Sequence, residues 1–241
     1  LLFQQSACSS FKAVAETNWR NYDLQQPRGS VPVGPLVIMI HMASVWVPFT
    51  SESKEAIADY DEAVRLKPDF ANAYNNRGIA NRAAGLADRA IADFNAALRI
   101  NPDFASALGN RGSAYADRGD LEHAVADFTR AIELNPDSVG AYNNRGNAYK
   151  AKGEAARAII DYTKAIELNP NLALAYYNRG LSLHAKGDNE GAVADYTKAI
   201  ALSPNNAAAY LDRGIANRAR RSFDDAIADY NRVISLEPNN A

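Results

Sequence analysis

The 241-residue sequence is poor in the residues from which covalent and metal-based sites are built. It contains one cysteine, Cys8, and three histidines, which are His41, His123 and His184. A single cysteine excludes an intrachain disulfide and a cysteine-based metal cluster, and the histidines are far apart in the chain. The sequence also lacks a glycine-rich phosphate loop, a nucleophile elbow and a zinc-protease motif. We therefore predict no catalytic residue, no metal and no cofactor, and a protein that is not an enzyme.

An excess of charge of either sign is also lacking. The chain has 26 basic and 28 acidic side chains, a net charge of −2, so no overall basic field favours nucleic acid as a partner. Its hydrophobic fraction of 47% and charged fraction of 22% are typical of a folded, soluble chain. These values favour a soluble protein and leave cytoplasm and periplasm equally open.

What the sequence does contain is a repeat with a period of 34 residues. Prolines keep this interval at Pro68, Pro102, Pro136, Pro170, Pro204 and Pro238. Glycines, alanines and aromatic residues keep the same register, in series such as Gly78, Gly112, Gly146, Gly180 and Gly214. Because several residue types share one register without an insertion, the chain is expected to stack identical supersecondary units.

Each unit is expected to form two helices. In the copy at 139–172, apolar residues of the second half recur at helical spacing, including Ala158, Ile159, Tyr162 and Ala165. We predict a first helix near 141–152 and a second near 155–168, because Gly153 suits the turn and a proline cannot continue a helix. The small residues Gly146 and Ala158 would let the two helices approach closely.

On these residues the chain resembles the tetratricopeptide repeat family. The run Y-N-N-R-G-N-A-Y, followed by A-I-I-D-Y and the proline, matches the family pattern of large, small and aromatic positions. The resemblance implies an all-α, right-handed superhelical solenoid and a protein-binding function. Five complete repeats are expected at 71–104, 105–138, 139–172, 173–206 and 207–240, preceded by an orphan second helix at 53–70 and a non-repeat segment at 1–52.

One departure from the family pattern is systematic. An arginine precedes the repeated glycine where the family packs a leucine, and an aspartate recurs in every second helix. Because an unpaired arginine would be costly there, we expect each arginine to bind an aspartate of its own or the preceding unit; the alternative is that the arginines bind an acidic ligand. The candidate ladder comprises Arg77, Arg111, Arg145, Arg179 and Arg213 with Asp59, Asp93, Asp127, Asp161, Asp195 and Asp229.

The resemblance also implies a concave groove lined mainly by the first helices. A column of carboxamides is suited to an extended peptide, since each group offers donors and an acceptor, and O-linked N-acetylglucosamine transferases carry a similar column; the alternative is that these side chains hold neighbouring loops. Basic residues one turn later would favour acidic peptides, or form a solvated rim. The candidate groove residues are Asn76, Asn110, Asn144, Asn178 and Asp212, with Arg82, Lys150, His184 and Arg218.

A lysine-based clamp for a peptide carboxylate, as in heat-shock co-chaperones of the family, is missing as a set. The positions where the resemblance places its lysines hold Asn75, Gly109, Asn143, Tyr177 and Leu211. A chaperone-tail receptor is therefore disfavoured.

The two ends of the chain carry further expectations. Residues 31–49 form an uncharged run of 19 residues, but prolines confine its unbroken helical part to 36–47, which is short for a bilayer. We favour a substitute for a missing first helix there, with membrane association as the alternative. At the other end the last hairpin lacks a solvating helix. We therefore expect either that the array continues or that this end pairs with a partner or with another copy of the chain.

The function predicted from the sequence is therefore a non-catalytic scaffold that binds a protein or peptide partner in its groove. Two alternatives are kept: the substrate-recognition arm of a larger enzyme, such as a glycosyltransferase, and a membrane- or envelope-associated assembly factor. The partner itself does not follow from the sequence, because folds of this kind bind many ligands.

Overall fold

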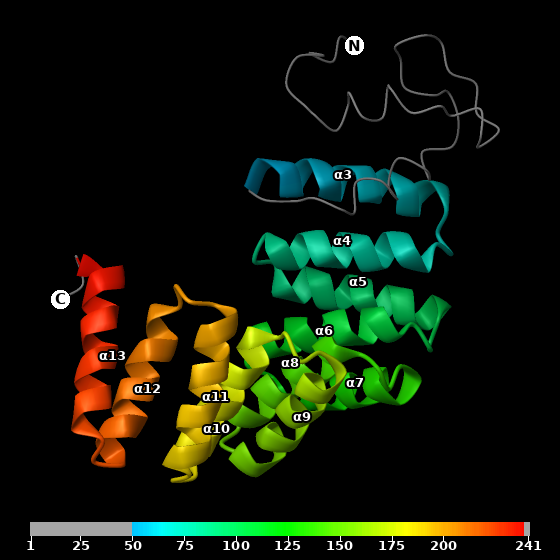
Figure 1. Ribbon diagram of the computed structural model, residues 1–241. Coiled ribbons are helices and arrows are strands. Elements are labelled where there is room, and N and C mark those ends of the chain that lie inside the picture. Colours follow the sequence, from blue (N-terminus) through cyan, green and yellow to red (C-terminus); the bar gives the residue numbers. More distant parts are fainter. Residues whose placement is uncertain (1–49, 239–241) are drawn as a thin grey trace, which may run out of the picture. The chain divides into compact units, whose positions relative to one another are not determined.

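The computed structural model describes residues 50–238, and the regular structure of this part is entirely helical (Figure 1). This confirms the predicted all-α helical repeat solenoid. The helices are α3 (Thr50–Leu66), α4 (Ala71–Ala83), α5 (Ala87–Ile100), α6 (Ala105–Asp117), α7 (Leu121–Leu134), α8 (Val139–Ala151), α9 (Ala155–Leu168), α10 (Ala173–Ala185), α11 (Asn189–Leu202), α12 (Ala207–Ala219) and α13 (Phe223–Leu236).

Successive helices pair into hairpins of a 13-residue first helix and a 14-residue second helix. The pairs pack as α4 with α5, α6 with α7, α8 with α9, α10 with α11 and α12 with α13. Before the first hairpin, α3 packs on α4 through a cluster of Tyr60, Ala63 and Ala73. It begins at Thr50, a few residues earlier than the orphan helix expected from residue 53.

The chain divides into two compact units, Leu1–Pro102 and Asp103–Ala241. In the described residues, the first unit holds α3 to α5 and the second holds α6 to α13. Within the second unit the first helices of neighbouring hairpins contact each other, α6 with α8, α8 with α10 and α10 with α12. Its described second helices make no comparable contact with one another. The first helices therefore lie on the inner side of this unit, and we call their shared surface the first-helix face.

Each hairpin closes around a glycine that faces an aromatic ring. A Cβ atom added at Gly146 would lie 2.8 Å from Cε1 of Tyr162, which is fully buried. The same contact recurs in the other hairpins, for example between Gly180 and Tyr196. The repeated alanine of the second helix, such as Ala158, has no exposed surface. Close approach of the two helices thus explains why small and aromatic residues share the 34-residue period.

The turn inside each hairpin requires a left-handed residue. Gly85, Gly119, Gly153 and Gly187 have φ angles between 75° and 84°. In the last hairpin Arg221 occupies this position with a φ of 64°. A side chain in this region is strained, because its Cβ approaches the following carbonyl oxygen. The last repeat therefore adopts the common turn at an energetic cost.

Part of the exposed surface of α13 is apolar. Ile227 and Ile234 are 57% and 51% exposed, whereas Ile200, which stands in the preceding repeat where Ile234 stands in the last, is 8% exposed. Val193 and Ile200 lie on the face of α11 toward the next hairpin, and α11 packs on α12. Self-association through this surface remains a prediction.

Two expectations fall outside the described residues. Both the helix substitute and the alternative membrane association of residues 31–49 concern a segment that precedes Thr50. Among the described helices, none is long and apolar enough to cross a membrane.

Candidate functional site

The arginine before each repeated glycine reaches the second helix of its own hairpin. Arg145 on α8 donates from Nε and Nη2 to the two carboxylate oxygens of Asp161 on α9, at 2.8 and 2.7 Å. Its Nη1 donates to Oγ1 of Thr129 on α7 at 3.1 Å. One guanidinium therefore ties three helices from two hairpins.

The same arrangement recurs along the chain. Each arginine binds the aspartate 16 residues later, in the pairs Arg77–Asp93, Arg111–Asp127, Arg179–Asp195 and Arg213–Asp229. The arginines also contact the preceding repeat, but not through the aspartates of the expected ladder. Arg179 and Arg213 donate to Thr163 and Thr197, and Arg77 donates to Asp61 at 2.7 Å.

Asp59 departs from the expected ladder. The other aspartates of its register bind the arginine 16 residues earlier, and the residue 16 positions before Asp59 is Ala43. Arg77, which pairs with Asp93, also binds Asp61 and not Asp59. The two carboxylates are two residues apart on α3, so they lie on different faces of the helix. Asp61 stands where three later repeats carry Thr129, Thr163 and Thr197. Those threonines also bind the arginine of the following repeat. Burial, and after it the charge of Glu55, raises the pKa of Asp59.

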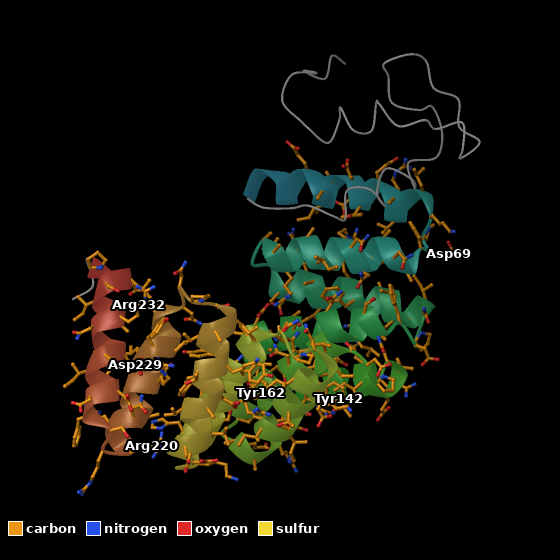
Figure 2. The ribbon with its side chains drawn as sticks, viewed as in Figure 1. Asp69, Tyr142, Tyr162, Arg220, Asp229 and Arg232 are labelled. Atoms are coloured by element: carbon orange, nitrogen blue, oxygen red, sulfur yellow. The ribbon has the colours of Figure 1, made fainter. Side chains whose placement is uncertain are left out.

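These ion pairs are shielded from solvent. The side chain of Asp161 is 4% exposed and that of Arg145 is 17% exposed. The hydrogen bond to Asp161 raises the pKa of Arg145, against the opposing effect of burial. The guanidinium carbon also lies 5.8 Å from the ring centroid of Tyr142, a residue labelled with Tyr162 in Figure 2. A planar cation with a fork of donors suits such a position, where lysine would lose the paired contact.

The predicted carboxamide column is not uniform. Oδ1 of Asn144 accepts a hydrogen bond from Asn143 at 3.3 Å, and in the first unit Asn76 accepts one from Asn75 at 3.2 Å. Asn178 is 6% exposed, and its Oδ1 accepts from Nζ of Lys150 at 2.8 Å. Within this column, Asn178 therefore has a contact that holds neighbouring hairpins together.

Among the predicted basic residues, Lys150 and His184 lie beside asparagine side chains: Lys150 donates to Asn178, and His184 contacts Asn189. Lys150 is half-buried, and burial lowers its pKa while the Asp212 carboxylate opposes that shift. Nδ1 of His184 lies 2.6 Å from Oδ1 of Asn189. Arg82 and Arg218 are exposed on α4 and α12. Asp212, the last member of the predicted column, accepts a hydrogen bond from the Tyr177 hydroxyl at 2.7 Å.

A cavity of about 250 Å³ opens between α6 and α8 in the second unit. Two predicted groove residues, Asn110 and Asn144, line it. It also contains residues that the sequence analysis did not select for the site, among them Gly109, Ser113 and Gly140. The available signal was their small size, since α10 carries Tyr177 and Leu181 where α6 carries Gly109 and Ser113.

No group of three or more histidine, cysteine, aspartate or glutamate side chains that could hold a metal occurs within residues 50–238. His123 instead contacts Asp120 at 2.8 Å, and its ring stacks on Tyr115. Many of the described polar side chains thus bind one another, and the cavity on the first-helix face is the candidate site for a ligand.

Comparison with known families agrees with this geometry. A TPR repeat model matches residues 112–153, 146–187 and 180–219, and a tetratricopeptide repeat model matches residues 51–105. Together these matches span more than half of the chain. The chain belongs to the tetratricopeptide repeat family. Such repeats are protein-interaction scaffolds, typically without catalytic activity, and they bind protein partners.

Solved tetratricopeptide repeat proteins share the fold. The crystal structure of MamA is 28% identical, with a TM-score of 0.64 over 68% of this chain and 95% of that one. PilW, a widely conserved type IV pilus biogenesis factor, is 19% identical, with a TM-score of 0.72 over 78% and 88%. YrrB, described as a TPR protein with an unusual peptide-binding site, is 19% identical, with a TM-score of 0.64 over 75% and 93%.

The N-terminal part resembles a different protein. Residues 1–70 match a model of the transducer of the topoisomerase VI B subunit. The corresponding type 2 DNA topoisomerase 6 protein of Methanosarcina mazei is 56% identical over 59 residues, and that of Methanococcoides burtonii 44% identical over 87 residues. These alignments cover 24% and 33% of this chain, and the chain spans only 10% and 14% of those proteins. The likeness overlaps the first tetratricopeptide match between residues 51 and 70.

Proposed function

We propose that the first-helix face of the second unit binds peptide segments of a partner protein. The observation that carries this proposal is the cavity between α6 and α8, which has Asn110 and Asn144 in its wall. A peptide placed across this opening would meet two carboxamides one hairpin apart. Each carboxamide offers donors and an acceptor, so the pair can bind backbone groups whatever the peptide sequence.

Apolar side chains on the same face support a peptide ligand. Leu174 on α10 is 52% exposed and Leu211 on α12 is 43% exposed. Leu174 stands in its repeat where Ser106 stands in the repeat of α6, and Leu211 stands where Gly109 stands. Ser106 and Gly109 both line the cavity. Burial of such side chains would add to affinity, so the face offers apolar contacts beside polar ones.

The proposed ligand need not be acidic. Lys150 and His184 hydrogen-bond to Asn178 and Asn189, which directs these basic side chains to neighbouring residues of the protein. A bias toward acidic peptides would rest on exposed Arg218 in this unit. We propose that contacts with the peptide backbone make the main contribution to affinity, and that charge makes a modest one.

Selection from a displayed library of random peptides on the full chain tests the proposal. Selected peptides should bind Asn110→Ala/Asn144→Ala about tenfold more weakly than the wild type, measured by fluorescence anisotropy. Asn178 is left unchanged, because its loss would also remove the contact with Lys150.

The matched control is Asn205→Ala/Asn231→Ala, which removes two carboxamides from exposed positions outside the first helices. It should keep wild-type affinity and the same helical circular dichroism. Equal loss in both variants, or unchanged affinity in the Asn110/Asn144 variant, would refute recognition by this face.

A second candidate function follows from the N-terminal likeness. We propose that residues 1–70 attach the repeat array to a protein related to this type 2 DNA topoisomerase, so that the array recruits partners to it. The supporting observation is the 56% identity over 59 residues. Because the match spans only 10% of that protein, its activity is not transferred to this chain.

Immunoblotting of native cell extracts with an antibody to the repeats tests this second candidate. A product far larger than the 26.1 kDa of this sequence, containing topoisomerase peptides by mass spectrometry, would support it. A product near 26 kDa that fails to co-purify with the topoisomerase would overturn it.

A further inference from the structure

The cavity between α6 and α8 is lined by two glycines that packing does not require. A Cβ atom added at Gly109 or at Gly140 would meet nothing within 4 Å. Gly112, on the same helix as Gly109, differs, since its added Cβ would lie 3.0 Å from the Phe128 ring. Glycine inside a helix costs about 0.5–1 kcal/mol relative to alanine. The fold therefore explains Gly112 but leaves Gly109 without a structural reason.

Neighbouring repeats show what the fold tolerates at this position. Where α6 carries Gly109, later first helices carry Asn143, Tyr177 and Leu211. Where α6 carries Ser113, α10 carries Leu181. Among the described first helices, only α6 combines small residues at these positions, and it is there that the cavity opens. The missing side chains define the volume that a ligand group would fill.

The lining decides the chemistry of that group. All twelve lining residues are uncharged. The inner residues Phe128, Ala131 and Ala141 are buried and apolar, whereas Ser106 and Asn135 lie exposed at the rim. An ionised side chain would lose hydration there without a counter-charge. The cavity thus suits an apolar group inside and a polar backbone at its mouth.

Hydrogen bonds within the cavity wall also favour an apolar ligand group. The Ser113 hydroxyl donates to the Gly109 carbonyl at 2.9 Å, and the Ser138 hydroxyl accepts from the Ala141 amide at 3.3 Å. These polar groups are thus partly satisfied inside the protein, which lowers the demand for a polar ligand in the interior. The volume of about 250 Å³ lies below the usual range of small-molecule sites, so a single large side chain is the fitting occupant.

Resting on the proposed peptide-binding function, we infer that this cavity is a specificity pocket for one large apolar side chain of the bound peptide, of the phenylalanine or leucine class. The peptide backbone crosses the rim at Asn110 and Asn144, and the side chain enters beside Gly109 and Gly140. The apolar anchor supplies selectivity, and the carboxamides supply sequence-independent contacts.

Heteronuclear NMR on the isotope-labelled full chain tests this inference. The probe is the blocked heptapeptide acetyl-SGSFSGS-amide, with versions carrying L, A, E or K at the centre. The F and L peptides should shift the amide resonances of Gly109 and Gly140, leave Gly187 unaffected, and bind about tenfold more tightly than the A, E and K peptides.

Two variants separate the pocket from folding. Gly109→Leu, which introduces the residue found at Leu211, should keep the helical circular dichroism and weaken F-peptide binding about tenfold. Gly109→Ala checks the fold, and should leave the unfolding temperature unchanged or raise it.

The outcomes also distinguish this inference from the proposed function. If library peptides bind through Asn110 and Asn144 but Gly109→Leu leaves their affinity unchanged, the pocket is refuted and the function stands. Equal binding of the F and E peptides would likewise refute it. If no library peptide binds the wild type, the proposed function fails, and the specificity pocket with it.

Discussion

At the scale of the residue, glycines of the first helices fall into two kinds. Gly146 faces the Tyr162 ring, and no larger residue fits without displacing it. Gly109 faces open space. Periodicity in the sequence marks only the first kind, since a packing requirement recurs in every repeat and a ligand requirement does not.

Gly146→Ala should reduce the free energy of unfolding by about 1–3 kcal/mol, because its Cβ would overlap the Tyr162 ring in a closely packed hairpin. Urea denaturation of the full chain measures this change. Gly109→Ala is the matched control on an equivalent helix, and is expected to be neutral or slightly stabilising. Equal destabilisation by both substitutions would contradict the distinction between the two glycines.

Arg221 is a second residue whose local conformation should have a measurable effect on the free energy of unfolding. Its φ of 64° is strained for a side chain, whereas Gly187 takes the same turn without strain. Arg221→Gly should stabilise the chain by about 0.5–1 kcal/mol, the strain relieved exceeding the entropy that glycine adds to the unfolded state. Thermal unfolding would show this, with Gly187→Ala as the reverse test; a lower unfolding temperature for Arg221→Gly would contradict it.

Lys150 gives a pH-dependent prediction. Burial lowers its pKa from the ordinary 10.5, and the Asp212 carboxylate limits the shift. Asp212→Asn should lower this pKa further, observable in the NMR titration of the Lys150 side chain.

The protonation of Lys150 is linked to the stability of the folded chain. Below the folded-state pKa, charged Lys150 opposes folding in Asp212→Asn. As pH rises through that pKa toward the unfolded value, the penalty disappears. The stability deficit of the variant relative to the wild type should therefore shrink between neutral and alkaline pH. A constant deficit over that range would contradict the prediction.

At the scale of the element, the arginines connect helices that are distant in sequence. Arg145 on α8 binds Asp161 on α9 and Thr129 on α7. The buried carboxylate and the arginine satisfy each other, which makes the loss of either partner costly. We propose that the ladder is structural and that ligand binding is a separate property of the first-helix face.

Arg145→Met should destabilise the chain by about 3–5 kcal/mol, because it leaves the Asp161 carboxylate buried without its partner. Adding Asp161→Leu should recover part of this loss, since the unpaired charge is then removed. Denaturant unfolding of the single and double variants measures both effects. Unchanged stability in Arg145→Met, together with loss of peptide binding, would reverse the proposed role.

The helices themselves are the part that sequence reasoning predicts best. The second helix predicted at 155–168 matches α9, and the first predicted near 141–152 lies within a few residues of α8. Turn glycines and the terminal proline act locally, which explains this agreement. Arg77 binds Asp93 of its own repeat, as expected, but its additional contact with Asp61 was not predicted. The choice of Asp61 over Asp59 depends on the rotation of α3 against α4, which local patterns do not specify.

At the scale of the whole molecule, the free energy of unfolding should be a sum of two contributions. One is the intrinsic stability of each repeat, and the other is the interface energy between neighbouring hairpins. The second unit, Asp103–Ala241, contains four hairpins with their own glycine–aromatic contacts. These features indicate that it does not depend on the N-terminal segment for its fold.

A fragment of residues 103–241 should therefore fold by itself. We expect high helicity by circular dichroism and a cooperative thermal transition, because four stacked hairpins supply both intrinsic repeat stability and interfaces between neighbours. The helical content per residue of the full chain is the reference. A fragment without a cooperative transition would contradict the independence of this unit.

The sequence by itself determined the hairpins, their period and their family, because the small, aromatic and turn residues act within one repeat and recur in each. Only the tertiary structure decided which polar groups are already engaged, such as Asn178 with Lys150, and where the face opens beside Gly109. Those features depend on how neighbouring hairpins pack, and on side chains that differ from one repeat to the next.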